Sequence, residues 1–111
     1  MNRLIFLFGI ILLITINNSC QKATDFASIY GVVSDSETKY PINGVTVVLM
    51  QSGEPKITKT DGKFEFKELD EGYYDITYSK EGYVTDRKNK IFAIKNKPIE
   101  ASTQLKPIEN P

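Results

Sequence analysis

The sequence predicts an all-β fold in which seven strands form a sandwich of two small sheets. Three observations support this prediction. Apolar and polar residues alternate with a period of two through most of the chain beyond the first 28 residues. Turn-forming residues recur about every ten positions, a spacing typical of sandwiches and barrels. No window in that part of the chain carries a sustained helical period, and 111 residues suffice for one ordinary domain.

Residues 1–19 have the layout of a secretory signal peptide. One cation, Arg3, precedes an apolar run from Leu4 to Ile16, and polar residues follow. At about 1.5 Å per residue, a helix over this run reaches about 20 Å, which is shorter than a hydrocarbon core of about 30 Å. We therefore expect a cleaved signal and not a permanent membrane span.

The small residue Ser19 directly before the lone Cys20 resembles the lipobox of bacterial lipoproteins, with Asn17 in the place where that motif usually has Leu. In such proteins the signal is cut before the Cys, whose sulfur receives a diacylglycerol. The resemblance implies lipidation of Cys20, a tether over residues 20–28, and a place in the bacterial cell envelope. There the outer membrane is favoured over the inner one, with the domain periplasmic or on the surface. The alternative is a plain secretory signal followed by an incidental Cys.

Residues 29–107 form the predicted domain, and residues 108–111 a tail. The seven strands are expected, in order, at residues 28–34, 45–51, 56–60, 63–67, 73–80, 90–95 and 99–106. Each is bounded by Gly, Pro, Asn, Asp or Ser residues that favour turns. Between the third and fourth strands stands Asp61-Gly62, which we interpret as a bend between strands and not as an acid held out for chemistry.

Alternation assigns the faces of these strands. In the fourth, Phe64 and Phe66 point inward, whereas Lys63, Glu65 and Lys67 face water. Three further sets of residues are predicted to share a face. In the second strand both faces are apolar, so this strand could be covered by other elements on one side or on both. The sets are Val45, Val47 and Leu49; Tyr74, Ile76 and Tyr78; and Ile99, Ala101, Thr103 and Leu105.

The order of these features resembles the carboxypeptidase regulatory-like domain, a transthyretin-like Greek-key sandwich. The similarity extends from about Ile29 to Leu105 and includes a Thr-Asp-Gly turn before an aromatic strand. One departure is that the loop from Ser36 to Tyr40 lacks the Gly commonly found before the Pro. The matching positions are Gly31, Val33, Asp35, Pro41, Gly44, Val45, Thr60, Asp61, Gly62, Phe64, Leu69, Gly72, Tyr74, Gly82 and Tyr83. The resemblance implies a non-catalytic module with variable partners.

Composition argues against several classes of function. The chain has 14 Lys and Arg against 14 Asp and Glu, so it lacks the surplus of positive charge that nucleic-acid binding needs. It has no His, which removes the usual near-neutral general base and the commonest metal ligand. A single Cys cannot form an intramolecular disulfide or a Cys-based zinc site. We expect no nucleic-acid partner and no cofactor, and we assign no catalytic residue.

Two further kinds of site were considered. The acids Asp61, Glu68, Asp70, Glu71 and Asp75 could hold Ca²⁺, yet interleaved lysines favour a mixed, solvated face and no metal. Aromatic side chains could stack on sugars if they are exposed, and the candidates are Tyr30, Tyr40, Tyr73, Tyr83 and Phe92. The sequence thus predicts a non-catalytic, lipid-anchored envelope module for protein interaction or structural support, with a membrane and another envelope protein as partners. Its alternative is carbohydrate binding through exposed Tyr side chains.

Overall fold

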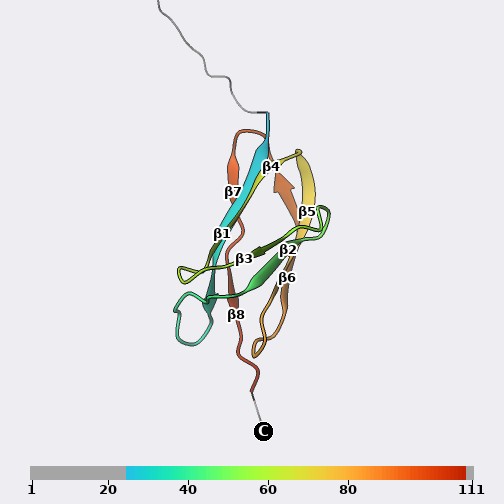
Figure 1. Ribbon diagram of the computed structural model, residues 1–111. Helices are drawn as coiled ribbons and strands as arrows, with labels where there is room; N and C mark the ends of the chain where they lie inside the picture. Colours follow the sequence, from blue (N-terminus) through green and yellow to red (C-terminus); the bar gives the residue numbers. More distant parts are fainter. Residues whose placement is uncertain (1–24, 110–111) are drawn as a thin grey trace, which may run out of the picture.

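The computed structural model describes residues 25–109, which form a sandwich of two four-stranded sheets (Figure 1). Cys20 and the predicted signal peptide lie outside the described residues. The described part consists of strands and turns, and it contains no helix long and apolar enough to cross a membrane. The predicted all-β sandwich is therefore confirmed.

The first sheet is built around the longest strand, β1 (Ala27–Asp35). An antiparallel neighbour pairs with one side of it, and two short strands pair in parallel with its other side, one after the other. These are β4 (Lys63–Leu69), β7 (Pro98–Glu100) and β8 (Thr103–Leu105). Figure 1 shows β7 and β8 following each other along β1, so β1 is the centre of this sheet.

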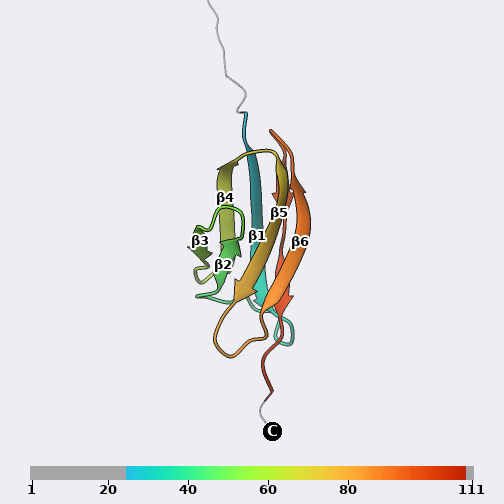
Figure 2. The same cartoon turned by 90° about the vertical axis from the view of Figure 1, so that its right-hand side faces the viewer.

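The second sheet is fully antiparallel and lies against the first (Figure 2). Its strands follow the order β3-β2-β5-β6 across the sheet. They are β2 (Thr46–Leu49), β3 (Pro55–Ile57), β5 (Gly72–Ser79) and β6 (Asp86–Ala93). The edges of the two sheets are therefore β3 and β6 in one sheet and β4 and the β7–β8 line in the other.

The structure has eight strands where seven were predicted, because the strand expected at residues 99–106 is interrupted at Ala101 and Ser102. The hydroxyl of Ser102 accepts the Val32 N–H at 2.9 Å, so a side chain takes the place of a ladder partner there. Gly31 makes room for this detour, since a Cβ atom on it would lie 2.9 Å from backbone atoms of Ala101 and Ser102.

The sixth strand also differs from its prediction. It was expected at residues 90–95, and β6 instead covers Asp86–Ala93. Its first half is charged, and Lys90 has a φ of 58°, at a point where the pairing of β5 with β6 shifts register. A β-bulge and a run of charged residues hide the period-two pattern of an edge strand.

The core lies between the sheets, where the predicted inward side chains meet. Tyr78 and Phe64 pack edge to face with their ring centroids 5.9 Å apart, and the Tyr78 hydroxyl donates to the Ala101 carbonyl at 2.6 Å. Tyr74 and Ile99 pack around this core without being fully buried. In β2 and its flanks, Val47 and Leu49 are buried whereas Met50 on the opposite face is exposed, so this strand is covered on one side only.

Candidate functional site

The outer face of the second sheet carries exposed apolar side chains. Tyr73 of β5 and Phe92 of β6 are directly opposite each other, with ring centroids 4.8 Å apart and ring planes tilted by 48°. Their exposed fractions are 65% and 40%. Met50 is also exposed on this side of the sheet, whereas the exposed Ile57 lies toward the other end of it, in the row of Thr46 and Ser79. We call Met50, Tyr73 and Phe92 the aromatic face.

Strand alternation and register place these residues together. Ile76 and Tyr78 of β5 point into the core, so Tyr73, Asp75 and Thr77 face outward, except where the bulge near Asp75 adjusts the pairing. The Met50 N–H donates to the Asp75 carbonyl at 2.9 Å, and the Thr77 hydroxyl lies 3.4 Å from the Met50 sulfur. Apolar side chains exposed together on one sheet face are typical of an interaction surface.

Asp75 supports the aromatic face through two hydrogen bonds. Its carboxylate accepts the Lys90 N–H at 2.9 Å, and its own N–H donates to the Gln51 side chain at 3.0 Å. The carboxylate thereby holds the bulge at Lys90, two residues before Phe92. The five acids considered for Ca²⁺ do not converge, and residues 25–109 contain no group of three His, Cys, Asp or Glu side chains able to hold a metal ion.

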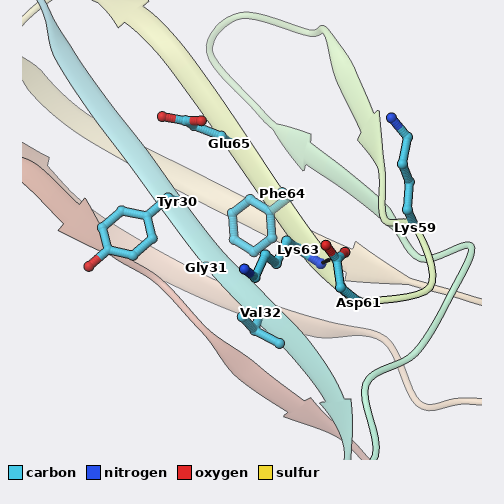
Figure 3. Close-up of a pocket in the computed structure, with 8 residues that line it drawn as sticks. All are labelled: Tyr30, Gly31, Val32, Lys59, Asp61, Lys63, Phe64 and Glu65. Atoms are coloured by element: carbon cyan, nitrogen blue, oxygen red, sulfur yellow. Dashed lines mark hydrogen bonds between the residues drawn. The ribbon is translucent and has the colours of Figure 1, made fainter.

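A cleft of about 500 Å³ lies over β1, β4 and the turn between β3 and β4 (Figure 3). It is lined by Tyr30, Gly31, Val32, Lys59, Asp61, Lys63, Phe64 and Glu65. Asp61 accepts the Lys63 N–H at 3.0 Å, and Gly62 has a φ of 71°. The prediction that Asp61 and Gly62 form the bend before an aromatic strand is confirmed. The charged groups of the cleft are of both signs, which favours a solvated surface over a site for one ion.

The predicted exposure of aromatic side chains is confirmed for four of the five candidates. Tyr30, Tyr40, Tyr73 and Phe92 are exposed, Tyr40 most of all at 73%. Tyr83 is half-buried and packs against the core. Of the exposed four, Tyr73 and Phe92 form a ring pair, so they are the best candidates for a binding surface.

Sequence reasoning missed a polar anchor at the end of β1. Asp35 is buried, and its Oδ1 accepts the N–H groups of Glu37 and Thr38 at 2.7 and 2.9 Å. Its Oδ2 accepts the Tyr83 hydroxyl at 2.8 Å. The Thr38 N–H, the Tyr83 hydroxyl and the Glu37 N–H all stabilise the carboxylate and lower its pKa, in that order of size.

The same contact raises the pKa of Tyr83, because its neutral hydroxyl is the donor and burial adds to the effect. The short segment from Asp35 to Thr38 is typical of an Asx turn and could have been noticed. Tyr83 lies 48 residues away, and no local pattern links it to Asp35.

A family model agrees with this fold. The model of the CarboxypepD_reg-like domain matches residues 29–110, which is most of the chain. The match begins within β1 and continues past β8. No curated protein is similar to the chain at a significant level.

Solved structures share the fold at low sequence identity. A chain of a cohesin–X-dockerin complex from Acetivibrio cellulolyticus has 23% identity and a TM-score of 0.58, covering 68% of this chain and 51% of its own. A protein from Bacteroides uniformis with a suggested role in carbohydrate binding has 12% identity and a TM-score of 0.58, covering 76% and 43%. The major pilin subunit of Bacillus cereus has 17% identity and a TM-score of 0.54, covering 75% and 30%. The chain thus spans about half or less of each of these proteins.

Proposed function

The chain belongs to the CarboxypepD_reg-like domain family, and from this premise we propose that it is a non-catalytic, lipid-anchored module of the bacterial cell envelope that binds another envelope protein. The observation that carries the proposal is the aromatic face, where Tyr73 and Phe92 pair in the open. Proteins of similar fold include a chain of a cohesin–X-dockerin complex and a pilin subunit. These supply an analogy for assembly through a β-sandwich.

The aromatic face is suited to a protein partner on energetic grounds. Covering apolar surface contributes about 25 cal/mol for each Å² removed from water, and aromatic residues dominate the energetic centres of interfaces. Tyr73 and Phe92 hold each other in place, so little conformational freedom is lost when a partner covers them. Support for a non-catalytic role comes from the absence of His in the chain and from the family.

Cross-linking in membranes tests the partner. The full chain, expressed in its native host and cross-linked there, is expected to give one predominant adduct with another envelope protein. The double variant Tyr73→Ala/Phe92→Ala should lose this adduct. Tyr40→Ala is the matched control, because Tyr40 is an exposed aromatic residue in the loop after β1, away from the aromatic face. Equal adduct yields from the double variant and the control would refute the proposed face.

The lipid anchor has its own test. Lipidation of Cys20 predicts that the chain takes up a fatty-acid probe and fractionates with membranes, most of it with the outer membrane. A Cys20→Ala variant should lose both the label and the membrane association. If the variant is labelled as strongly as the parent chain, lipidation of Cys20 is wrong, whatever the outcome for the protein partner.

Carbohydrate binding is the second candidate, and the Tyr73–Phe92 pair favours it as well. Aromatic rings on a flat sheet face can stack on sugar rings, and a protein of similar fold has a suggested role in carbohydrate binding. A glycan array separates the two candidates. Binding that Tyr73→Ala removes and Tyr40→Ala retains would support a carbohydrate ligand. No glycan signal, together with a specific protein adduct, would leave the first proposal standing alone.

A further inference from the structure

Within residues 25–109, three of the four sheet edges discourage pairing with another chain. The β3 edge is three residues long and begins with Pro55. The β7–β8 edge consists of two three-residue strands with a break between them. The β6 edge carries Arg87, Lys88 and Lys90, and the positive φ of Lys90 distorts it. Short length, proline, positive charge and bulges are the usual protections of an edge strand. The fourth edge, β4, lacks proline and is seven residues long, and its own bulge, at Glu68 with a φ of 56°, lies near its end and leaves residues 63–67 regular.

The backbone of β4 presents hydrogen-bonding groups along this edge. The Gly62 carbonyl accepts the Val33 N–H at 2.8 Å, so the backbone of Gly62 faces β1. Because these groups alternate in direction along a strand, those of Phe64 and Phe66 also face β1. The groups of Glu65 and Lys67 therefore face the open edge. The N–H of Lys63, at the beginning of β4, also faces this edge, but it already donates to the Asp61 carboxylate.

The exposed side chains of β4 are complementary in charge to those of a second, antiparallel copy of the same strand. Lys63, Glu65 and Lys67 alternate in sign along the outer face of the strand. If two β4 strands pair antiparallel with Glu65 at the centre, glutamate faces glutamate and lysine faces lysine. With Phe66 at the centre, each Glu65 faces the partner's Lys67. Directly opposed charges of unlike sign stabilise a strand pair and those of like sign destabilise it, so the second register is selected.

We propose that the free edge of β4 pairs antiparallel with β4 of a second copy of this chain, with Phe66 at the two-fold axis. The open backbone groups of Glu65 and Lys67 then bond across the axis, and the Asp61–Lys63 contact stays intact. A register centred on Phe64 also matches charges but breaks that contact. In Figure 2, β3 lies beside the beginning of β4, and the end of β4 extends past it, so β3 does not cover that end of the edge. This self-pairing does not depend on the partner of the aromatic face.

Zero-length cross-linking identifies the pairing directly. Full-length chains with light and heavy isotopes are mixed in detergent micelles and treated with a carbodiimide, which couples amines to carboxylates in contact. The expected product is a mixed-isotope peptide pair that joins Glu65 to Lys67. Glu54, an exposed acid in the β2–β3 loop, is the internal control. The proposal is overturned if mixed-isotope coupling is no more frequent at Glu65 than at Glu54. The chosen register is overturned if Glu65 couples to Lys63 in place of Lys67.

Charge reversal gives an independent test. Glu65→Lys places three lysines along β4, and we expect the fraction of dimer, measured by analytical ultracentrifugation in micelles without a cross-linker, to fall about tenfold. Lys63→Glu/Lys67→Glu places three acids there, and its dimer fraction should fall similarly. A mixture of the two variants should recover the dimer. Circular dichroism verifies that each variant is folded, and Glu54→Lys controls for net charge. Dimer yield that is unchanged in Glu65→Lys, or not recovered in the mixture, rejects the pairing.

Discussion

Two adjoining turns of this domain hold a residue in the left-handed conformation, and only one of them uses glycine. Gly62, before β4, has a φ of 71°, and Lys39, in the loop after β1, has a φ of 70°. The turns are in contact, because a Cβ atom on Gly62 would lie 2.9 Å from the Pro41 side chain. Two different residues, a short distance apart, therefore adopt nearly the same positive φ.

The difference between the two turns lies in their surroundings. Gly62 is buried, and a Cβ atom there would lie 2.5 Å from the Val33 carbonyl oxygen. Lys39 is exposed, and its amine donates to the Ser36 carbonyl at 2.7 Å. The Asp35 carboxylate orders the same loop through two backbone N–H groups. A left-handed residue with a β-carbon costs about 1–2 kcal/mol, which this loop offsets. Packing, and not φ alone, makes glycine necessary before β4.

The largest expected effect is that of Gly62→Val. The clash with the Val33 carbonyl adds to the backbone strain, so we expect a loss of at least about 3 kcal/mol in the free energy of unfolding. Gly53→Val is the matched control, because Gly53 has a φ of 72° and open space around it. It should lose only about 1–2 kcal/mol. Denaturant unfolding followed by circular dichroism measures both, and equal losses would contradict the importance of packing.

Removal of the Tyr83 hydroxyl should have the next largest effect. Tyr83→Phe deletes the hydrogen bond to Asp35, and we expect a loss of about 1 kcal/mol in the free energy of unfolding. The variant keeps the ring that packs against the core, so the measured change isolates the polar contact. A Tyr83→Phe protein as stable as the parent would show that the loop after β1 is held by its two backbone contacts alone.

The same anchor predicts a pH dependence. Folding lowers the pKa of Asp35 below its ordinary value of 3.8. The carboxylate therefore stabilises the fold above that pH, and this stabilisation is lost as the pH falls toward the lowered pKa of the folded state. Compared with Asp35→Asn, the parent chain should lose its advantage progressively over the range in which the pH falls from about 5 to below 3.8. A stability difference that is constant over this range would mean that Asp35 does not titrate as described.

A smaller effect of opposite sign is expected for Lys39→Gly. Glycine relieves the strain at φ 70° but adds entropy to the unfolded chain, and the net result should be a gain of about 0.5 kcal/mol. Lys39→Ala keeps the strain and removes the amine contact with Ser36, so it should give no gain. Thermal unfolding of the two variants distinguishes them. A loss of stability in Lys39→Gly larger than in Lys39→Ala would show that the loop does not carry the strain.

The sequence predicted elements with one buried and one exposed face. In β4, the alternation of Phe64 and Phe66 with charged residues was sufficient, because burial imposes the period. Alternation did not predict the first half of β6, because edge residues there are charged on both faces and a bulge breaks the period. The interruption at Ser102 was not predicted either, because its contact with Val32 spans 70 residues of chain. Interruptions of this kind depend on the assembled sheet.

The same division applies to the candidate site. Exposure of Tyr73 and Phe92 could be predicted, because neither ring falls on a predicted inward position of its strand. Their pairing could not, because it depends on how β5 and β6 are aligned after the bulge near Asp75. The Asp35–Tyr83 contact depends likewise on the ends of distant segments meeting in space. Period-two patterns report which face a side chain occupies, and tertiary register decides which side chains meet.

The smallest expected effect is that of Asp61→Ala, beside the residue with the largest. Asp61 is exposed, and its carboxylate accepts a hydrogen bond from the Lys63 N–H. Removing that bond should cost less than about 0.5 kcal/mol, because water takes the place of the exposed acceptor. The aromatic face lies on the other sheet, so partner binding should be unchanged. Lost adduct formation by a folded Asp61→Ala protein would mean that the cleft of Figure 3, and not the aromatic face, contacts the partner.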